Sequence, residues 1–107
     1  MRSYVGILLI LSALPGAGIV QAGDITAGKA KSIACLACHG VDGIGTNPQR
    51  PNLAGQKAHY LIQQLRAFRD GERVDPAMNA VAKMLSDTDI ENLAAYYSSL
   101  SRAGKSE

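Results

Sequence analysis

Tryptophan is absent from this sequence of 107 residues, phenylalanine occurs once, and cysteine occurs only twice. So short a chain with few aromatic residues buries a small apolar core, and such domains usually need a disulfide, a metal or a cofactor as additional support. The 11 basic and 9 acidic residues nearly balance, which argues against a nucleic-acid binder because those proteins carry a strong basic excess. The length allows one small domain and no second.

The first 22 residues have the organisation of a signal peptide. Arg2 supplies a positive charge, an apolar run extends from Val5 to Leu14, and Val20-Gln21-Ala22 resembles a cleavage site. The run is too short, and too broken by proline and glycine, to span a membrane comfortably. We therefore expect cleavage after about Ala22 rather than an uncleaved anchor. The mature protein, residues 23–107, should then be soluble and exported, in a bacterium to the periplasm.

Helical periodicity and helix-breaking residues divide the rest of the chain. The segments 40–55 and 71–78 carry glycine and proline and predict two long loops. Loops that long in so small a domain suggest that they wrap something. The expected fold class is all-α with about three main helices, over residues 25–34, 58–70 and 86–100.

Cys35-Leu36-Ala37-Cys38-His39 is a C-x-x-C-H motif, the attachment signature of a c-type haem. Each cysteine can form one thioether bond to a vinyl group, and the adjacent histidine then reaches the iron as the proximal ligand. Attachment also explains how two cysteines of an exported chain avoid forming a disulfide with each other in an oxidising compartment.

Three other interpretations of the cysteine pair fit less well. A thioredoxin-like redox centre needs a βαβ frame, and no alternating strand pattern is present. A structural zinc site needs four ligands at ordered spacing, whereas the second histidine, His59, lies 20 residues beyond the motif within a predicted helix. A disulfide across a two-residue gap closes too small a loop to stabilise a domain.

A haem iron held by one histidine can take a sixth ligand on its other face. The candidates are Met78, Met84 and His59. Met78 follows Asp75-Pro76 in an expected loop, where it is free to approach the iron. We expect Met84, two residues before the helix start at Ser86, to pack against the last helix instead. Any of these methionines could also simply fill the core, so the residues alone favour Met78 without excluding the others.

Taken together, several stretches resemble the class I c-type cytochromes, in particular the repeated halves of bacterial dihaem cytochromes c of the c-four type. The resemblance extends from about Gly28 to Leu100. Its order and spacing are far more specific than the C-x-x-C-H motif alone. The stretches are Cys35–Gly40, Pro51–Gln56, Tyr60-Leu61 with Gln64-Leu65 and Phe68, Asp75–Met78, Leu85–Asp87 and Leu93–Tyr96.

The resemblance implies a role for each matching site residue. Cys35 and Cys38 would carry the thioethers of one covalent haem c, and His39 would bind its iron. Pro51 would accept a hydrogen bond from the imidazole through its carbonyl, Leu53 would pack on the haem, and Met78 would be the second axial ligand. Gly28 would let the first helix cross the last one closely, near Leu93 and Tyr96.

The implied function is one-electron transfer rather than enzymatic catalysis. An iron with both axial positions filled binds no small-molecule substrate, so the partners would be redox proteins, with no nucleic acid involved. The primary hypothesis is a periplasmic electron carrier. The alternative is an electron-accepting haem subunit of a periplasmic enzyme complex such as a sulfide-oxidising flavocytochrome. In either case the chain could dock to a membrane-bound or flavoprotein partner.

Overall fold

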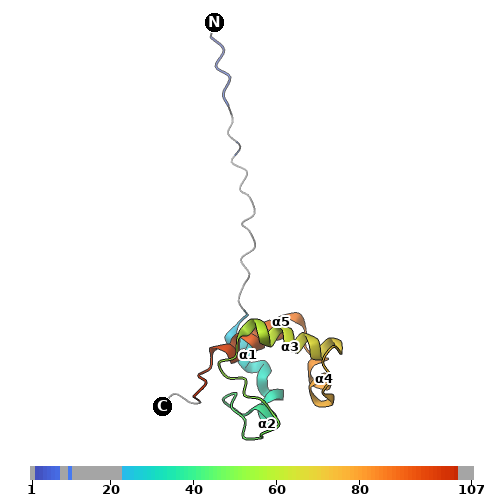
Figure 1. Cartoon of the computed structure of the whole chain (residues 1–107). Helices are drawn as coiled ribbons and strands as arrows, with labels where there is room; N and C mark the ends of the chain where they lie inside the picture. Colours follow the sequence, from blue (N-terminus) through green and yellow to red (C-terminus); the bar gives the residue numbers. More distant parts are fainter. Residues whose placement is uncertain (1, 8–9, 11–22, 104–107) are drawn as a thin grey trace.

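The computed structural model describes residues 2–7, 10 and 23–103. Most of the expected signal peptide, residues 1–22, therefore lies outside the described residues. Within them the chain is helical and contains no strand, so the expected all-α class is confirmed (Figure 1). No helix in the described ranges is long and apolar enough to cross a bilayer. The elements are α1 (Ile25–Lys31), the 3-10 helix η1 (Ser32–Cys35), α2 (Leu36–His39), α3 (Ala58–Asp70), α4 (Pro76–Ala82) and α5 (Asp87–Ser99).

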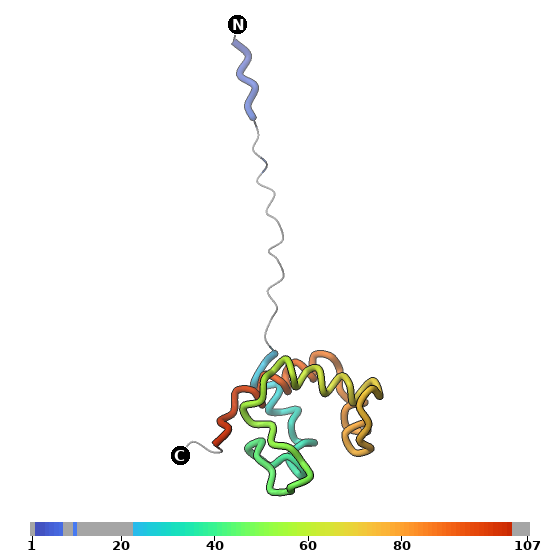
Figure 2. The backbone as a smooth tube through the Cα atoms, in the orientation of Figure 1, coloured from blue at the N-terminus to red at the C-terminus, as the bar shows by residue number. Residues whose placement is uncertain are grey.

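The first and last helices cross closely at Gly28. A Cβ atom on Gly28 would overlap the backbone carbonyl of Asn92 and lie 2.8 Å from Cβ of Tyr96. Only the absence of a side chain therefore permits this contact. The crossing begins one turn earlier, where the backbone N–H of Asp24 donates to Oδ1 of Asn92 at 2.8 Å. The tube in Figure 2 shows α1 lying against α5, although most of the sequence separates them.

The third helix packs across α5 and completes the apolar core. Leu61 of α3 joins a buried cluster with Leu93, Ala94, Tyr96 and Tyr97 of α5. Ion pairs also link the two helices at the surface, and the shortest joins Arg69 Nη1 to Asp87 Oδ1 at 2.8 Å. Helix α3 ends at Gly71, whose φ of +81° is the left-handed conformation that glycine adopts without strain. The sequence predicts this helix end correctly.

Helix α5 begins with a capping box. The Ser86 hydroxyl accepts from the backbone N–H of Asp89, and the Asp89 carboxylate accepts from the backbone N–H of Ser86, each at 3.0 Å. These two bonds satisfy N–H groups that have no partner within the helix.

Helix α4 contradicts the expectation of a loop through Met78. The helix begins at Pro76, and Asp75 is its N-cap, since its carboxylate accepts from the backbone N–H of Met78 at 3.0 Å. Proline at the first helical position has no N–H that needs a partner, so Asp-Pro opens a helix as readily as a turn. The expected loop is therefore shorter, and Met78 lies in the first turn of α4.

The segment between α2 and α3 contains no helix, as the density of glycine and proline predicts. Its path is set by backbone hydrogen bonds: the Gly43 carbonyl accepts from the N–H groups of Leu53 and Ala54, and the Gly55 N–H donates to the Tyr97 carbonyl. Gly43 has a φ of +76°. These bonds fold the loop back on itself and attach its far end to α5.

The α1–α5 crossing predicts the effect of one added methyl group. Alanine for glycine inside a helix normally stabilises by about 0.5–1 kcal/mol. For Gly28→Ala we expect instead a net loss of about 1–3 kcal/mol, because the methyl group must force the helices apart. Denaturant unfolding of the holoprotein measures the difference. Ala30→Val, on the exposed side of α1, is the control and should change stability far less. A Gly28→Ala protein as stable as the wild type would contradict the close crossing.

Candidate functional site

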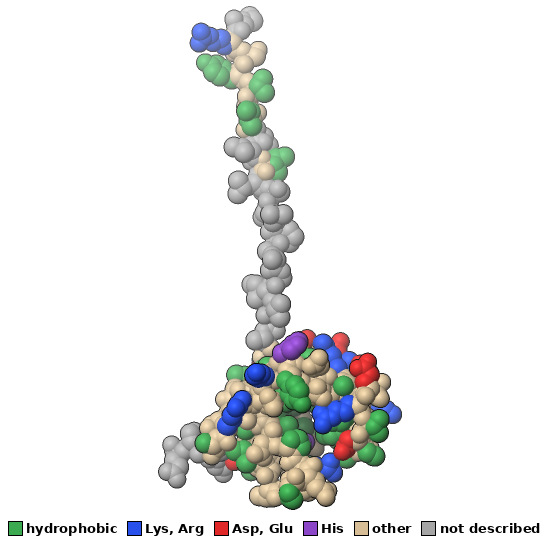
Figure 3. Space-filling model, in the orientation of Figure 1, with side chains coloured by type: hydrophobic (Ala, Val, Ile, Leu, Met, Phe, Trp, Pro, Cys, Tyr) green, Lys and Arg blue, Asp and Glu red, His purple; other side chains and the backbone are tan. Residues whose placement is uncertain are grey.

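A cavity of about 260 Å³ is lined by side chains of α2, α3, α4 and α5 and of the segment between α2 and α3. The space-filling view shows the surface hollowed near the middle of the helical body, with basic side chains along one edge (Figure 3). Most of the wall is apolar. It includes Leu53, Leu61, Leu65, Phe68 and Leu93. A flat, largely apolar group would therefore be enclosed on several sides by aliphatic and aromatic side chains.

His39 forms part of this wall and is held in one orientation. Its side chain is buried, and its Nδ1 donates to the Pro51 carbonyl oxygen at 2.8 Å. The bond fixes the ring and leaves Nε2 as the nitrogen with a free lone pair. It also makes the imidazole a better electron donor to a metal. The structure thus contains the hydrogen bond from the imidazole to the Pro51 carbonyl that the resemblance implies.

The two cysteines differ in their surroundings. Cys35 ends η1, is half-buried and lines the cavity, whereas Cys38 in α2 is exposed. In the part of the chain that the structure describes, neither forms a disulfide. Cys35 borders the cavity, and Cys38 lies at the surface.

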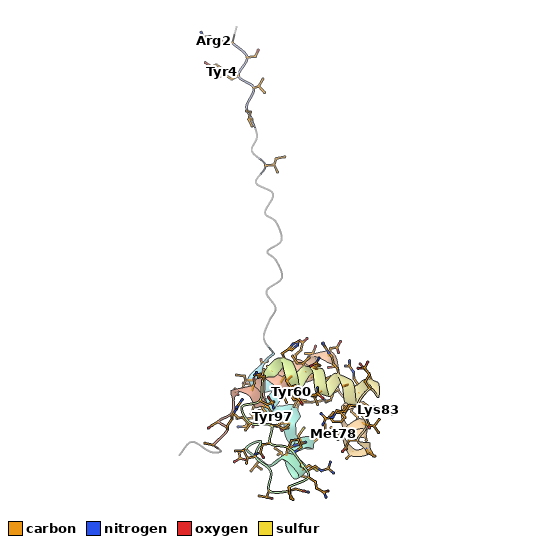
Figure 4. All side chains as sticks on the ribbon, in the orientation of Figure 1. Arg2, Tyr4, Tyr60, Met78, Lys83 and Tyr97 are labelled. Atoms are coloured by element: carbon orange, nitrogen blue, oxygen red, sulfur yellow. The ribbon has the colours of Figure 1, made fainter. Side chains whose placement is uncertain are left out.

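Among the three candidates for a second axial ligand, only Met78 lines the cavity with His39. Figure 4 shows Met78 on α4, reaching toward the space beneath α3. Met84 is 82% exposed, so the expectation that it packs against the last helix is wrong: the chain turns outward between Ala82 and Ser86. His59 is also exposed and borders a shallow surface depression with Arg66 and Asp70 instead.

Asn79 holds the Met78 side of the cavity in place, and no sequence motif singled it out. Its side-chain Nδ2 donates to the carbonyls of Phe68 and Arg73, each at 2.8 Å. Its Oδ1 accepts from the backbone N–H of Asp75, also at 2.8 Å. One amide thus ties α4 to the end of α3. An asparagine four residues after an N-cap aspartate is the signal that could have drawn attention to it.

Polar side chains gather at one edge of the cavity. The Arg73 guanidinium lies 4.5 Å from the centre of the Phe68 ring, and its Nη1 donates to Gln64 Oε1 at 2.8 Å. Arg50 Nη1 lies 3.6 Å from Oδ2 of Asp75. Both arginines line the cavity. Such donors suit acidic groups on an otherwise apolar ligand, which is the character of a haem with its two propionates.

The donor set fits a haem iron better than any other metal centre. No group of three or more His, Cys, Asp or Glu side chains able to hold a metal ion occurs among the described residues. A single oriented imidazole and a methionine sulfur on the wall of an apolar cavity are instead the ligands of cytochrome c-type haem. The cysteine beside the imidazole adds the means of covalent attachment.

The sequence profile of the family Cytochrome c matches residues 25–101. Cytochrome c-554(548) of Halomonas halodenitrificans is 51% identical over 81 residues, which cover 73% of this chain and 98% of that protein. The "thiosulfate dehydrogenase electron acceptor" of Thiomonas intermedia is 46% identical over 77 residues, 70% of this chain and 35% of that protein.

A solved structure, cytochrome c4 of Acidithiobacillus ferrooxidans, superimposes with a TM-score of 0.69 at 43% identity. The match covers 78% of this chain and 53% of that one. The chain therefore spans nearly all of one relative but about half or less of the two larger proteins.

The three hydrogen bonds of Asn79 predict that its side chain holds α4 in place. In Asn79→Ala we expect a loss of about 1–3 kcal/mol, because two backbone carbonyls lose their donor, with the loosening concentrated in α4. Hydrogen exchange of the amides of residues 78–82 should accelerate more than that of α5. Asn47→Ala, which removes a single acceptor in an exposed loop, should leave α4 unchanged. Equal acceleration in all helices would contradict a local role.

Proposed function

The chain belongs to the cytochrome c family, and we propose that Cys35 and Cys38 attach its single haem c, with His39 and Met78 as the axial ligands. The observation that carries the proposal is the joint placement of His39 and Met78 on the wall of one apolar cavity, while Met84 and His59 face solvent. Pro51 orients the imidazole through its carbonyl. Leu53 supplies part of the apolar wall.

The protein transfers electrons and is not an enzyme. Bound haem supplies the one-electron cycle between Fe(II) and Fe(III), and a neutral thioether ligand raises its potential. With haem bound, His39 and Met78 would both be ligands of its iron, which would leave no open position for a substrate. The apolar wall excludes water, and the arginines at the cavity edge offset the charge of acidic substituents.

The two cysteines proposed to attach the haem differ in their exposure to solvent. Cys35 is half-buried against the cavity, whereas Cys38 is exposed. We infer that electrons enter and leave by the edge of the haem nearest Cys38, because that edge would lie closest to the surface. Val41, which follows the motif by two residues and is 68% exposed, adds apolar surface at the end of the same segment. Short-lived contacts with redox partners are commonly of this mixed apolar and polar kind.

We also propose that the protein works in the periplasm as a freely diffusing carrier. The motifs of residues 1–22 support export. The similarity to a thiosulfate dehydrogenase electron acceptor supports a second candidate: a fixed partner of a dehydrogenase that oxidises reduced sulfur compounds. In that case the chemistry belongs to the other protein and this chain accepts its electrons.

The axial assignment predicts that the two methionines respond differently to substitution. A methionine sulfur on ferric haem gives a weak charge-transfer band at the edge of the near infrared. That band should disappear in Met78→Ala and survive in Met84→Ala, because Met84 is 82% exposed. Reduced Met78→Ala should also bind carbon monoxide, which the wild type should bind poorly.

Two results would contradict this assignment. Loss of the band in Met84→Ala with retention in Met78→Ala would show that the second ligand is misassigned. Ready binding of carbon monoxide by the reduced wild type would mean that the iron is open, and a catalyst or gas sensor would then be the better hypothesis.

The carrier and the fixed subunit predict different behaviour on native purification. A carrier should elute alone and be reduced by thiosulfate only after a separate dehydrogenase is added. A fixed subunit should elute with its dehydrogenase at constant stoichiometry and be reduced by thiosulfate without the addition of a separate dehydrogenase. Size-exclusion chromatography with absorbance at the haem band, followed by a reduction assay on the same fractions, measures both. Constant co-elution with one flavoprotein or dehydrogenase would contradict the carrier proposal and favour the fixed subunit.

A further inference from the structure

Arg50 precedes the proline whose carbonyl holds His39, and its side chain reaches the helix that carries Met78. Arg50 Nη1 lies 3.6 Å from Oδ2 of Asp75, the N-cap residue of α4. The segment that contains Arg50 precedes α3 and α4 follows it, so the two are attached to opposite ends of a helix of 13 residues (Figure 1). Such a helix is about 20 Å long. The ion pair therefore joins, at the edge of the cavity, two segments that α3 separates.

Asp75 connects this ion pair to Met78. Its Oδ1 accepts from the backbone N–H of Met78 at 3.0 Å, which leaves Oδ2 for Arg50. The backbone N–H of Asp75 donates to Oδ1 of Asn79 at 2.8 Å, and its carbonyl accepts from the backbone N–H of Asn79 at 2.7 Å. Every polar group of Asp75 thus has a partner, and these partners fix the carboxylate in one arrangement.

Burial alone does not fix the first turn of α4. Ala82, at the far end, is the one residue of α4 that is buried, whereas Met78 and Asp75 are only partly buried. The helix contacts α3 more than any other helix, and its seven residues are too few to form a stable helix without outside support. The position of Met78 therefore depends on the polar contacts at the N-cap.

Arg50 is held in place through its backbone as well as its side chain. Its backbone N–H donates to the Asn47 carbonyl at 3.1 Å, and the next residue, Pro51, accepts from His39. The side chain of Arg50 is 29% exposed and that of Asp75 is 40% exposed. Salt screens partly buried pairs less than fully exposed ones. The pair thus links the side of the cavity that holds the histidine to the start of α4.

We propose that Arg50 is a positioning residue for Met78: its ion pair with Asp75 keeps the first turn of α4, and with it the methionine sulfur, against the cavity. The inference rests on the proposed axial assignment of Met78. When the ion pair is lost, the first turn of α4 leaves the cavity more often, and small molecules then reach the axial position that Met78 would occupy. Arg50 thus helps to keep the site closed, which an electron carrier requires.

Binding of imidazole to the ferric holoprotein tests this proposal, since imidazole must replace Met78 at the iron. Imidazole is uncharged at mildly alkaline pH, so the loss of a charge at the cavity edge does not by itself change its approach. At saturating imidazole, the rate measured by stopped-flow mixing reports how often Met78 dissociates.

Four variants separate the ion pair from the other contacts of α4. Asp75→Asn removes the charge and keeps the N-cap, because asparagine caps helices as well as aspartate does. Arg50→Gln removes the other charge, and Arg50→Lys keeps it. Arg66→Gln is the matched control, since Arg66 Nη2 lies 3.8 Å from Glu91 Oε1 and this pair joins α3 to α5 instead.

We expect the imidazole rate to rise about two- to five-fold in Arg50→Gln and in Asp75→Asn, the range that partly exposed ion pairs give. Arg50→Lys should show a smaller rise, and Arg66→Gln should keep the wild-type rate. The double variant of Arg50→Gln and Asp75→Asn should bind imidazole no faster than either single variant, because both changes remove the same contact. Added salt should raise the wild-type rate and leave that of the double variant unchanged, since salt weakens only the ion pair.

Two results overturn the proposal. A wild-type rate in Arg50→Gln would show that Arg50 does not hold Met78. Rate increases that multiply in the double variant would show that Arg50 and Asp75 act separately, with Arg50 bound to an acidic group of the haem instead. Failure of the axial assignment is recognised separately, because the charge-transfer band of the ferric protein would then survive in Met78→Ala.

Discussion

The crossing of α1 over α5 at Gly28 is the constraint on which the rest of the structure depends. The backbones approach so closely that Asn92 and Tyr96 occupy the space of a Gly28 side chain. Because η1 and α2 continue directly from α1, the crossing also sets where Cys35 and His39 lie relative to α5. A few residues at one crossing thus position two groups of the site.

The two sides of the cavity are held by different means. On the histidine side, packing of α1, α3 and α5 and the 2.8 Å bond from His39 to Pro51 fix the wall. On the methionine side, α4 is a short helix attached to the end of α3 chiefly through the polar bonds of Asn79. Polar bonds near the surface are individually weak. The methionine side is therefore the part of the fold that should open first.

Local sequence signals predicted most of the fold and drew attention to the motif at residues 35–39, which contains His39 and both cysteines. The apolar periodicity of α3, its end at Gly71 and the capping box of α5 are all encoded within a few residues of each helix. The C-x-x-C-H spacing likewise predicts chemistry from five consecutive residues.

Helix α4 escaped prediction because seven residues are too few to show a helical period, and Asp75-Pro76 opens turns and helices alike. The exposure of Met84 depends on how α4 meets α5. Such features arise from distant segments, and no short motif contains them.

The unequal burial of the two cysteines has a kinetic consequence. With Cys35 facing inward and Cys38 facing outward, the proposed haem would present one edge to solvent. A donor and an acceptor would then need the same patch of surface, so the two could not be bound at once. Turnover would proceed through alternating binary complexes, and an excess of either partner would slow the cycle by occupying the shared patch. Tight binding to one partner would thus be a disadvantage, and selection on this surface would favour fast release.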